Sequence, residues 1–169
     1  MNLRNEINQL STQGFRWYGI RHADLSKTCI CVTDGTGGVR NPLPSCKRCF
    51  GTGHLFTDYL AHGYGWPSVL GTAFRTGPGQ ISTQTRNFVF RYDSIIAKFD
   101  LVLDLSLDLD TGDPIQPFKI LKVYEIQDSS QMAGFEGRLE FWKCIAEERN
   151  LSNSQVGEQG TSFKHTISQ

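Results

Sequence analysis

Four of the five cysteines of this chain are grouped as Cys29-x-Cys31 and Cys46-x-x-Cys49, with fourteen residues between the two pairs. Zinc in structural sites prefers four thiolate or imidazole ligands arranged as a tetrahedron. A tight Cys-x-x-Cys turn places two sulfur atoms on one metal ion, and a second close pair completes the site. We therefore predict one structural zinc ion bound by Cys29, Cys31, Cys46 and Cys49.

The segment that carries these cysteines, residues 29–53, is rich in Gly, Pro, Thr, Ser and Asn. It has too few apolar side chains to fold on its own. Gly51 and Gly53 permit a sharp turn after Cys49. Zinc binding contributes about 10–16 kcal/mol in small peptides, which is enough to order such a segment. The metal site and the segment are therefore expected to form together.

Other interpretations of the cysteines stay open at the level of sequence. The four thiols can be free or buried without metal. Cys46 and Cys49 can form a redox dithiol, although that chemistry is typical of a thioredoxin-like βαβ context, which the sequence lacks. His54 is the only other nearby residue of a zinc-binding type and is an alternative to one cysteine. Cys144 stands alone in a strand-like run, which favours a small buried hydrophobic side chain.

Composition limits the classes of protein that the chain can belong to. Its 169 residues are 38% hydrophobic and 20% charged, as expected for one globular domain or a domain with a small module. The formal net charge is zero, whereas a dedicated nucleic-acid binder usually has a basic excess. No apolar run approaches the roughly 18–20 residues that cross a bilayer, and the N-terminus lacks a signal-peptide hydrophobic region. We expect folding in a reducing cytosol, without a membrane segment.

Hydrophobic periodicity predicts a mainly β fold. Leu3, Ile7 and Leu10 lie on one helical face and predict a short helix in residues 1–14. The remaining periodic segments alternate or are rich in β-formers, with Gly/Pro turns between them. Strands are expected at residues 15–22, 54–60, 99–109, 118–126 and 139–145.

The clearest strand signal is the alternation over residues 99–109. The odd positions, from Phe99 to Leu109, are all apolar, and the even positions are mostly Asp or Ser. We expect the odd positions to be buried and the aspartates to be exposed, so that Asp104→Asn is nearly neutral. The turn sequence at 110–114 makes residues 99–126 a predicted hairpin.

These elements predict a mainly β fold, a small β-barrel or sandwich, with an inserted four-cysteine zinc-ribbon-like module and a short N-terminal helix. The expected organisation is an N-terminal helix (1–14), a zinc-binding module with flanking strands (15–62), a β-rich domain (63–148) and a polar tail (149–169). Residues 61–80 are rich in Gly and Pro and are expected to be irregular. Three aromatic residues there can anchor that segment to a core or a partner: Tyr64, Trp66 and Phe74.

No other residues form a convincing catalytic or binding pattern. The aspartates between Asp100 and Asp113 do not match an EF-hand, because Gly112 comes too early and no glutamate closes the loop. They favour a solvated strand face, or a negative surface facing DNA in a channel. Three histidines have no recognisable catalytic partner: His22, His62 and His165. Basic residues near the cysteines are a weak signal for nucleic-acid binding: Arg16, Arg21, Lys47 and Arg48.

The motif Cys46-Lys-Arg-Cys49-Phe-Gly51-Thr-Gly53 fits the Cys-x-x-Cys-x-Gly-x-Gly repeat of J-domain chaperones, which carry four copies where this chain has one. The wider stretch, residues 15–60, resembles small structural proteins of tailed bacteriophages. There an aromatic strand precedes Cys-x-Cys, and a proline-containing loop leads to Cys-x-x-Cys-x-Gly-Thr-Gly. The corresponding segments here are Phe15-Arg-Trp-Tyr-Gly-Ile-Arg21 and Asn41-Pro-Leu-Pro44.

The phage resemblance implies a head–tail connector, or neck, protein located in the virion and assembled in the host cytoplasm. Such a protein forms a homo-oligomeric ring that contacts other neck, portal-side or tail proteins. DNA passes through its channel without sequence-specific binding, and the protein has no catalytic residues. Two other functions stay open: a zinc-ribbon module that binds nucleic acid, and a small redox or chaperone factor.

Overall fold

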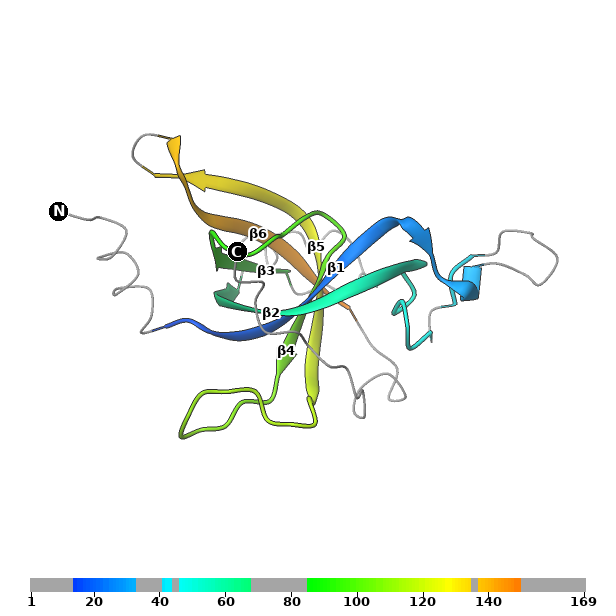
Figure 1. Ribbon diagram of the computed structural model, residues 1–169, viewed down its shortest axis with the longest axis horizontal. Helices are drawn as coiled ribbons and strands as arrows, with labels where there is room; N and C mark the ends of the chain where they lie inside the picture. Colours follow the sequence, from blue (N-terminus) through cyan, green and yellow to red (C-terminus); the bar gives the residue numbers. More distant parts are fainter. Residues whose placement is uncertain (1–13, 33–40, 44–45, 68–84, 135–136, 150–169) are drawn as a thin grey trace, which may run out of the picture.

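The computed structural model describes residues 14–32, 41–43, 46–67, 85–134 and 137–149 (Figure 1). Within them the chain forms six β-strands and one short 3-10 helix. The elements are β1 (Arg16–Thr28), η1 (Ile30–Val32), β2 (His54–Pro67), β3 (Thr85–Arg91), β4 (Leu101–Leu105), β5 (Ile120–Ala133) and β6 (Leu139–Arg149). The predicted mainly β class is confirmed.

All strand pairs are antiparallel and belong to one sheet, in the order β1-β2-β3-β6-β5-β4. The order closes on itself because β1 also pairs with β4, from Tyr18↔Asp104 to Arg21↔Leu101. β4 and β5 form the hairpin that the sequence predicts at 99–126, and β6 contains the predicted last strand. The sheet therefore encloses an interior lined by one face of every strand.

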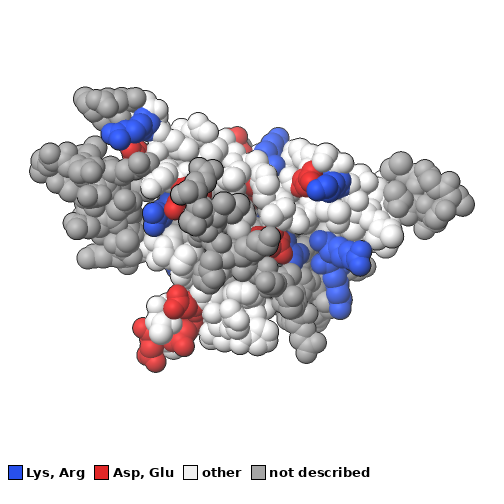
Figure 2. Space-filling view, viewed as in Figure 1, with Lys and Arg blue, Asp and Glu red and all other residues white. Residues whose placement is uncertain are grey.

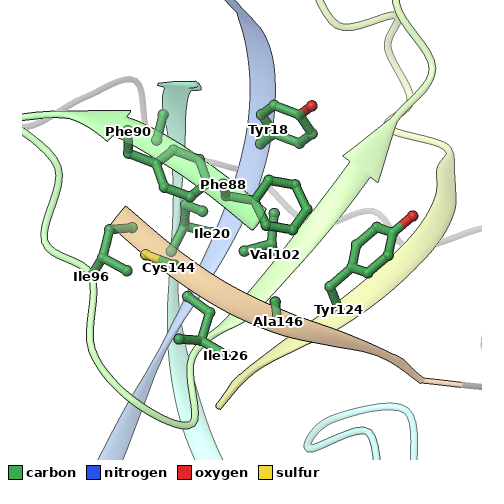
Figure 3. Packing of buried hydrophobic residues seen from close by; sticks show 11 residues of the cluster. Tyr18, Ile20, Phe88, Phe90, Ile96, Val102, Tyr124, Ile126, Cys144 and Ala146 are labelled. Carbon is green, nitrogen blue, oxygen red and sulfur yellow. The ribbon is translucent and has the colours of Figure 1, made fainter. Parts of the chain in front are cut away.

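This interior holds the main hydrophobic core (Figure 3). Tyr18 meets the rings of Phe88 and Phe90 edge-on, at centroid distances of 5.5 and 5.9 Å. Such edge-to-face contacts suit the aromatic quadrupole. All six strands supply buried core residues: Tyr18, Ile20, Ala61, Phe88, Phe90, Val102, Tyr124, Ile126, Cys144 and Ala146.

A second core covers the outer face of the sheet at β4. Leu101, Leu103 and Leu105 alternate with Val102, so they point away from the interior, yet all are fully buried. They pack with Phe50 from the cysteine segment, and Phe118 packs against the same cluster. β4 is thus buried on both faces.

The prediction of an exposed acidic face is wrong for Asp100 and Asp104, although Asp108 is exposed as expected. Asp100 is fully buried and Asp104 is only 8% exposed, whereas Phe99 and Leu109 at the predicted buried positions are exposed. The strand also ends at Leu105 rather than at residue 109. The reason is that the even positions face the closed interior, which a period of two in the sequence cannot distinguish from solvent.

The two buried aspartates are paired with donors. Asp100 accepts hydrogen bonds from the backbone amides of Ala23 (2.9 Å) and Ala97 (2.8 Å), and its other contact is His22 Nδ1 at 2.9 Å. Arg16 Nη2 donates to the carboxylate of Asp104. Near-neutrality of Asp104→Asn is therefore no longer expected, because the substitution removes the charge that Arg16 pairs with.

β2 continues through residues that the sequence predicts to be irregular. Gly63 and Gly65 lie opposite Phe90 and Phe88 in β3, and a Cβ added at either position would lie 2.5–2.7 Å from the facing ring. The rings of Phe88 and Phe90 occupy the space that a side chain at 63 or 65 would need. These glycines therefore belong to a strand and do not indicate a loop. The prediction of irregular structure is wrong for residues 61–67, and residues 68–84 lie outside the described residues.

Three further predictions fall outside the described part of the chain. These are the N-terminal helix, whose residues 1–13 are not described, the polar tail in residues 150–169, and the anchoring role of Phe74.

Candidate metal centre

The cysteines lie at the end of the β1–β2 ribbon that projects from the closed sheet (Figure 1). The ribbon ends at the pair Thr28↔His54, and the amide of Cys29 donates to the carbonyl of Gly53 at 2.7 Å. This bond brings the start and the end of the cysteine segment together. Strands β1 and β2 therefore act as two arms that position the site.

Two tight turns present the sulfur atoms. In the first, the amide of Val32 donates to the carbonyl of Cys29 at 2.9 Å. In the second, the amide of Phe50 donates to the carbonyl of Cys46 at 2.9 Å, and Thr52 donates to the carbonyl of Cys49 through both its amide and its hydroxyl. These hydrogen bonds by themselves define the conformation of the Cys-x-x-Cys turn.

The chain leaves the second turn through left-handed backbone. Phe50, Gly51 and Gly53 have φ values of 48°, 78° and 84°. At Gly53 a Cβ would also lie 2.9 Å from the ring of Pro42 and 3.1 Å from Val32. Both glycines expected at a sharp turn therefore adopt a positive φ that favours glycine, and at Gly53 there is also no room for a Cβ.

The four sulfur atoms of Cys29, Cys31, Cys46 and Cys49 all lie within 4.8 Å of one another. The Sγ atoms of Cys29 and Cys46 are 3.8 Å apart, and those of Cys31 and Cys49 are 3.4 Å apart. A zinc tetrahedron with bonds of about 2.3 Å requires sulfur–sulfur separations of about 3.8 Å. The four thiols can therefore hold a metal ion with little movement.

The same distances exclude a disulfide in this structure. A sulfur–sulfur bond is about 2.05 Å long, and all five cysteines are free thiols. Cys144 lies far along the chain in the interior core, where burial raises the pKa of its thiol to about 12. It behaves as the small buried hydrophobic residue that the sequence indicates.

The protonation of the cluster is uneven. Burial raises the pKa of Cys49 to about 12 and also raises the pKa of Cys29. Burial acts in the same direction on Cys46, but hydrogen bonds from the backbone amides of Cys49 and Arg48 outweigh it and lower the pKa of Cys46 to about 7. Cys46 therefore has more thiolate character near neutral pH than Cys29 or Cys49.

The cysteine turn is attached to the closed sheet through Phe50. Its ring is buried in the outer core beside Leu101 and Leu103, and the guanidinium carbon of Arg21 lies 4.4 Å from the ring centroid. Arg149, at the end of β6, donates to the carbonyl oxygen of Phe50 at 3.0 Å. Sequence reasoning missed this role, because these contacts join residues up to 99 positions apart.

The other residues that the sequence analysis selects are dispersed. Arg16 and Arg21 pair with Asp104 and Asp58, so they do not form a free basic surface. The ring of His62 packs against Trp17 with centroids 3.6 Å apart and planes tilted by 43°, and burial lowers the pKa of His62. His22 contacts the buried Asp100, a pair that no sequence pattern revealed.

His54 is near the cysteines but not among the clustered ligands. The described residues that can hold a metal together are the four cysteines alone. The Nδ1 atom of His54 is buried and has no hydrogen-bond partner within the described part of the chain. The residue instead lines a cavity beside the turn.

Comparison with known proteins adds no assignment: the sequence matches no protein-family model and no curated protein. Among the described residues, no helix has the length and apolar character needed to span a membrane. The function must therefore be argued from the cysteine site and its attachment to the sheet.

Proposed function

We propose that the four cysteines bind one structural zinc ion. Four thiolates form a closed soft-ligand site, which is typical of structural zinc and leaves no open position for a reacting molecule. The four soft thiolate donors favour zinc over oxygen-preferring cations, and sulfur–sulfur distances of 3.8 and 3.4 Å suit zinc–sulfur bonds of about 2.3 Å. The ion would connect η1 to the Cys-x-x-Cys turn and so hold Phe50 against the sheet.

Elemental analysis of untagged protein tests the metal. We expect one equivalent of zinc per chain, and Cys46→Ser should lower zinc retention and make residues 29–53 sensitive to limited proteolysis. Cys144→Ala is the matched control, since it removes the fifth thiol without touching the cluster. Less than about half an equivalent after gentle purification, or unchanged proteolysis of Cys46→Ser, would count against the site.

We further propose that the protein is a non-enzymatic structural subunit of a tailed-bacteriophage neck, forming a ring that joins head and tail around the DNA channel. The observation that carries this proposal is the four-cysteine turn, which is packed against a closed sheet through the buried ring of Phe50. Such an arrangement makes a small subunit rigid without devoting side chains to chemistry. The resemblance of residues 15–60 to phage structural proteins supports the phage context.

Size measurement and electron microscopy test the ring. Mass photometry of the zinc-loaded protein should show a closed homo-oligomer at working concentration, and particles of the source phage should contain the protein at the head–tail junction. A protein that is monomeric in solution and missing from particles would overturn the neck assignment.

A nucleic-acid-binding module is the second candidate. Lys47 and Arg48 are both exposed on the Cys-x-x-Cys turn, although Lys47 already has an interaction partner. This function predicts DNA binding that weakens steeply with salt and that is reduced in Lys47→Glu/Arg48→Glu. Absence of binding at low salt would remove it.

A further inference from the structure

The loop between β4 and β5 is a well-defined projection, here called the acidic loop (residues 106–115). Its base is closed by two backbone hydrogen bonds of 3.0 Å, from the amide of Ser106 to the carbonyl of Lys119 and from the amide of Ile115 to the carbonyl of Ser106. Nearer the tip, the amide of Asp108 donates to the carbonyl of Asp113 at 2.8 Å. The loop therefore has a fixed backbone that can present side chains in one arrangement.

An isolated apolar side chain occupies the tip of this loop. Leu109 is 102% exposed, and Ile115 is also exposed on the same loop. Aspartates at 108, 110 and 113 flank them, and Figure 2 shows acidic side chains gathered over this projection. A fully exposed leucine on a loop of fixed backbone buries no apolar surface within its own chain. Such a side chain is suited to anchor the loop on the surface of another molecule.

A cavity of about 300 Å³, here called the docking pocket, lies where the cysteine turn meets the closed sheet. Its walls come from β1, the cysteine turn, β2, the segment before β4, β5 and β6. The lining residues are Leu25, Gly51, Thr52, His54, Phe99, Glu125 and Arg149.

The pocket displays apolar side chains at some conformational cost. Leu25 is 57% exposed and Phe99 is 42% exposed. Phe99 has a φ of 73°, a left-handed conformation that bulky residues rarely adopt. The bond from its amide to the carbonyl of Ile126 and the neighbouring buried Asp100 hold it there. Strain that persists at an exposed ring is typical of a ligand contact.

The charges around the pocket complement those of the acidic loop. Glu125 and Arg149 lie 3.1 Å apart and neutralise one another. Lys98 is exposed and lies over the ring of Phe99 at 5.2 Å. Basic residues 47 and 48 are exposed on the turn that supplies two pocket residues, and Figure 2 shows Lys and Arg side chains grouped on that side. The turn and the segment that supply pocket residues therefore also carry exposed basic side chains, opposite in sign to the loop.

We propose that the acidic loop of one copy docks in the pocket of the next copy. Leu109 then lies between Leu25 and Phe99, and the aspartates face Lys47, Arg48 and Lys98. Phe99 in the pocket precedes β4 and the acidic loop follows it, and the five residues of β4 span roughly 17 Å, so one chain does not fill its own pocket. Two different surfaces give a heterologous contact, which closes into a ring when the rotation fits. This inference rests on the proposed ring.

Assembly of three single variants is the first test, measured by mass photometry and sedimentation. Leu109→Ser and Phe99→Gly each remove one half of the contact, and both should raise the concentration for half-assembly by about thirtyfold. Phe99→Gly also relieves the positive φ, so loss of assembly cannot be ascribed to added strain. Leu121→Ser removes another exposed leucine, on β5 and outside the pocket, and should assemble like wild type.

Mixing the two defective variants is the decisive test. Leu109→Ser keeps an intact pocket and Phe99→Gly keeps an intact loop, so an equimolar mixture should form a 1:1 dimer and stop there. If the wild type forms rings and Leu109→Ser assembles normally, the docking contact is wrong but the ring proposal is not. Absence of a dimer in the mixture has the same meaning. A wild-type protein that is monomeric at every concentration would overturn both.

Discussion

The residues that deviate most from simple hydrophobic patterning are the acids inside the sheet. Asp100 is fully buried, and burial raises the pKa of its carboxyl group while hydrogen bonds from His22, Ala23 and Ala97 act to lower it. Those donors connect β1 and the segment before β4 to one carboxylate. A buried acid tolerates its position only while such partners are present.

We predict that Asp100→Asn destabilises the protein by about 2 kcal/mol or more, because an amide can replace only one of the accepting oxygens. Urea unfolding followed by tryptophan fluorescence measures the change. Asp128→Asn is the control: that side chain is exposed on β5, outside the acidic loop, and the change should stay within about 0.5 kcal/mol. Equal stability of the two variants would mean that the buried carboxylate contributes nothing.

The cysteine pKa values predict how metal affinity varies with pH. Near pH 8 the thiols of Cys29 and Cys49 are protonated, since burial raises both pKa values, whereas Cys46 with a pKa of about 7 is mostly thiolate. Metal binding must then release at least two protons, and each proton weakens binding about tenfold per unit fall in pH.

Apparent zinc affinity should therefore fall at least about 100-fold from pH 8 to pH 7, and more steeply below pH 7 as Cys46 also becomes protonated. Competition with a chelating dye, corrected for the protonation of the dye itself, provides the measurement. An affinity that does not change over this range would contradict the assignment of protonated thiols.

At the scale of secondary-structure elements, the pairing of β2 with β3 depends on two glycines. We predict that Gly63→Ala destabilises the fold by about 1–3 kcal/mol, because the new methyl group would lie 2.5 Å from the ring of Phe90 and 2.8 Å from the carbonyl oxygen of Val89. Gly14→Ala is the control, since its methyl group would meet Tyr64 at an ordinary 3.5 Å. Thermal unfolding distinguishes them, and recovery of stability in Gly63→Ala/Phe90→Leu would identify the ring as the cause.

Local sequence patterns predict the positions of the strands well, but they do not predict which residues pack against each face of a strand. The alternation at 99–109 correctly indicates a strand, and Leu101, Leu103 and Leu105 are buried as expected. Burial of Asp104 depends on closure of the sheet through β1, and burial of the leucines depends on Phe50 from a distant part of the sequence. Such long-range contacts do not affect the hydrophobic periodicity of the sequence, so a local pattern cannot predict them. The glycine-rich stretch at 61–67 misleads for the same reason, since the facing rings belong to another strand.

The cysteine cluster is predictable because spacing alone nearly determines a tetrahedral site. The structure brings the sulfur atoms of the two Cys pairs within 4.8 Å of one another, as a shared metal ion would require. The docking pocket is not predictable in this way. Leu25, Phe99 and Arg149 come from three separated strands or loops, and only the folded chain brings them together.

At the scale of the whole molecule, the protein has two cores of different origin. The interior core draws on all six strands and includes no residue of the cysteine segment, whereas the outer core includes Phe50 from the turn that carries the proposed zinc ligands. Arg21 and Arg149 contact Phe50 from β1 and β6. The proposed zinc site is thus connected through Phe50 to the outer core and not directly to the interior core.

This division predicts the response to metal removal. Chelation should release Phe50 and expose Leu101, Leu103 and Leu105, while the interior core and most strand pairing persist. Hydrogen exchange should therefore increase in residues 46–60 and in β4, with little change in β3 and β6, and the far-ultraviolet circular dichroism should be largely retained. Binding of a hydrophobic dye should rise as the outer leucines become accessible.

Phe50→Ala in the zinc-loaded protein separates the metal from the packing. It should keep one equivalent of zinc, lose about 3–5 kcal/mol of stability, and reproduce the exchange pattern at β4 but not that at the cysteines. Chelation that unfolds β3 and β6 together with the cysteine turn would show instead that the closed sheet cannot stand without the metal. In that case the zinc ion would stabilise the entire fold, and Phe50→Ala would be expected to weaken zinc retention as well.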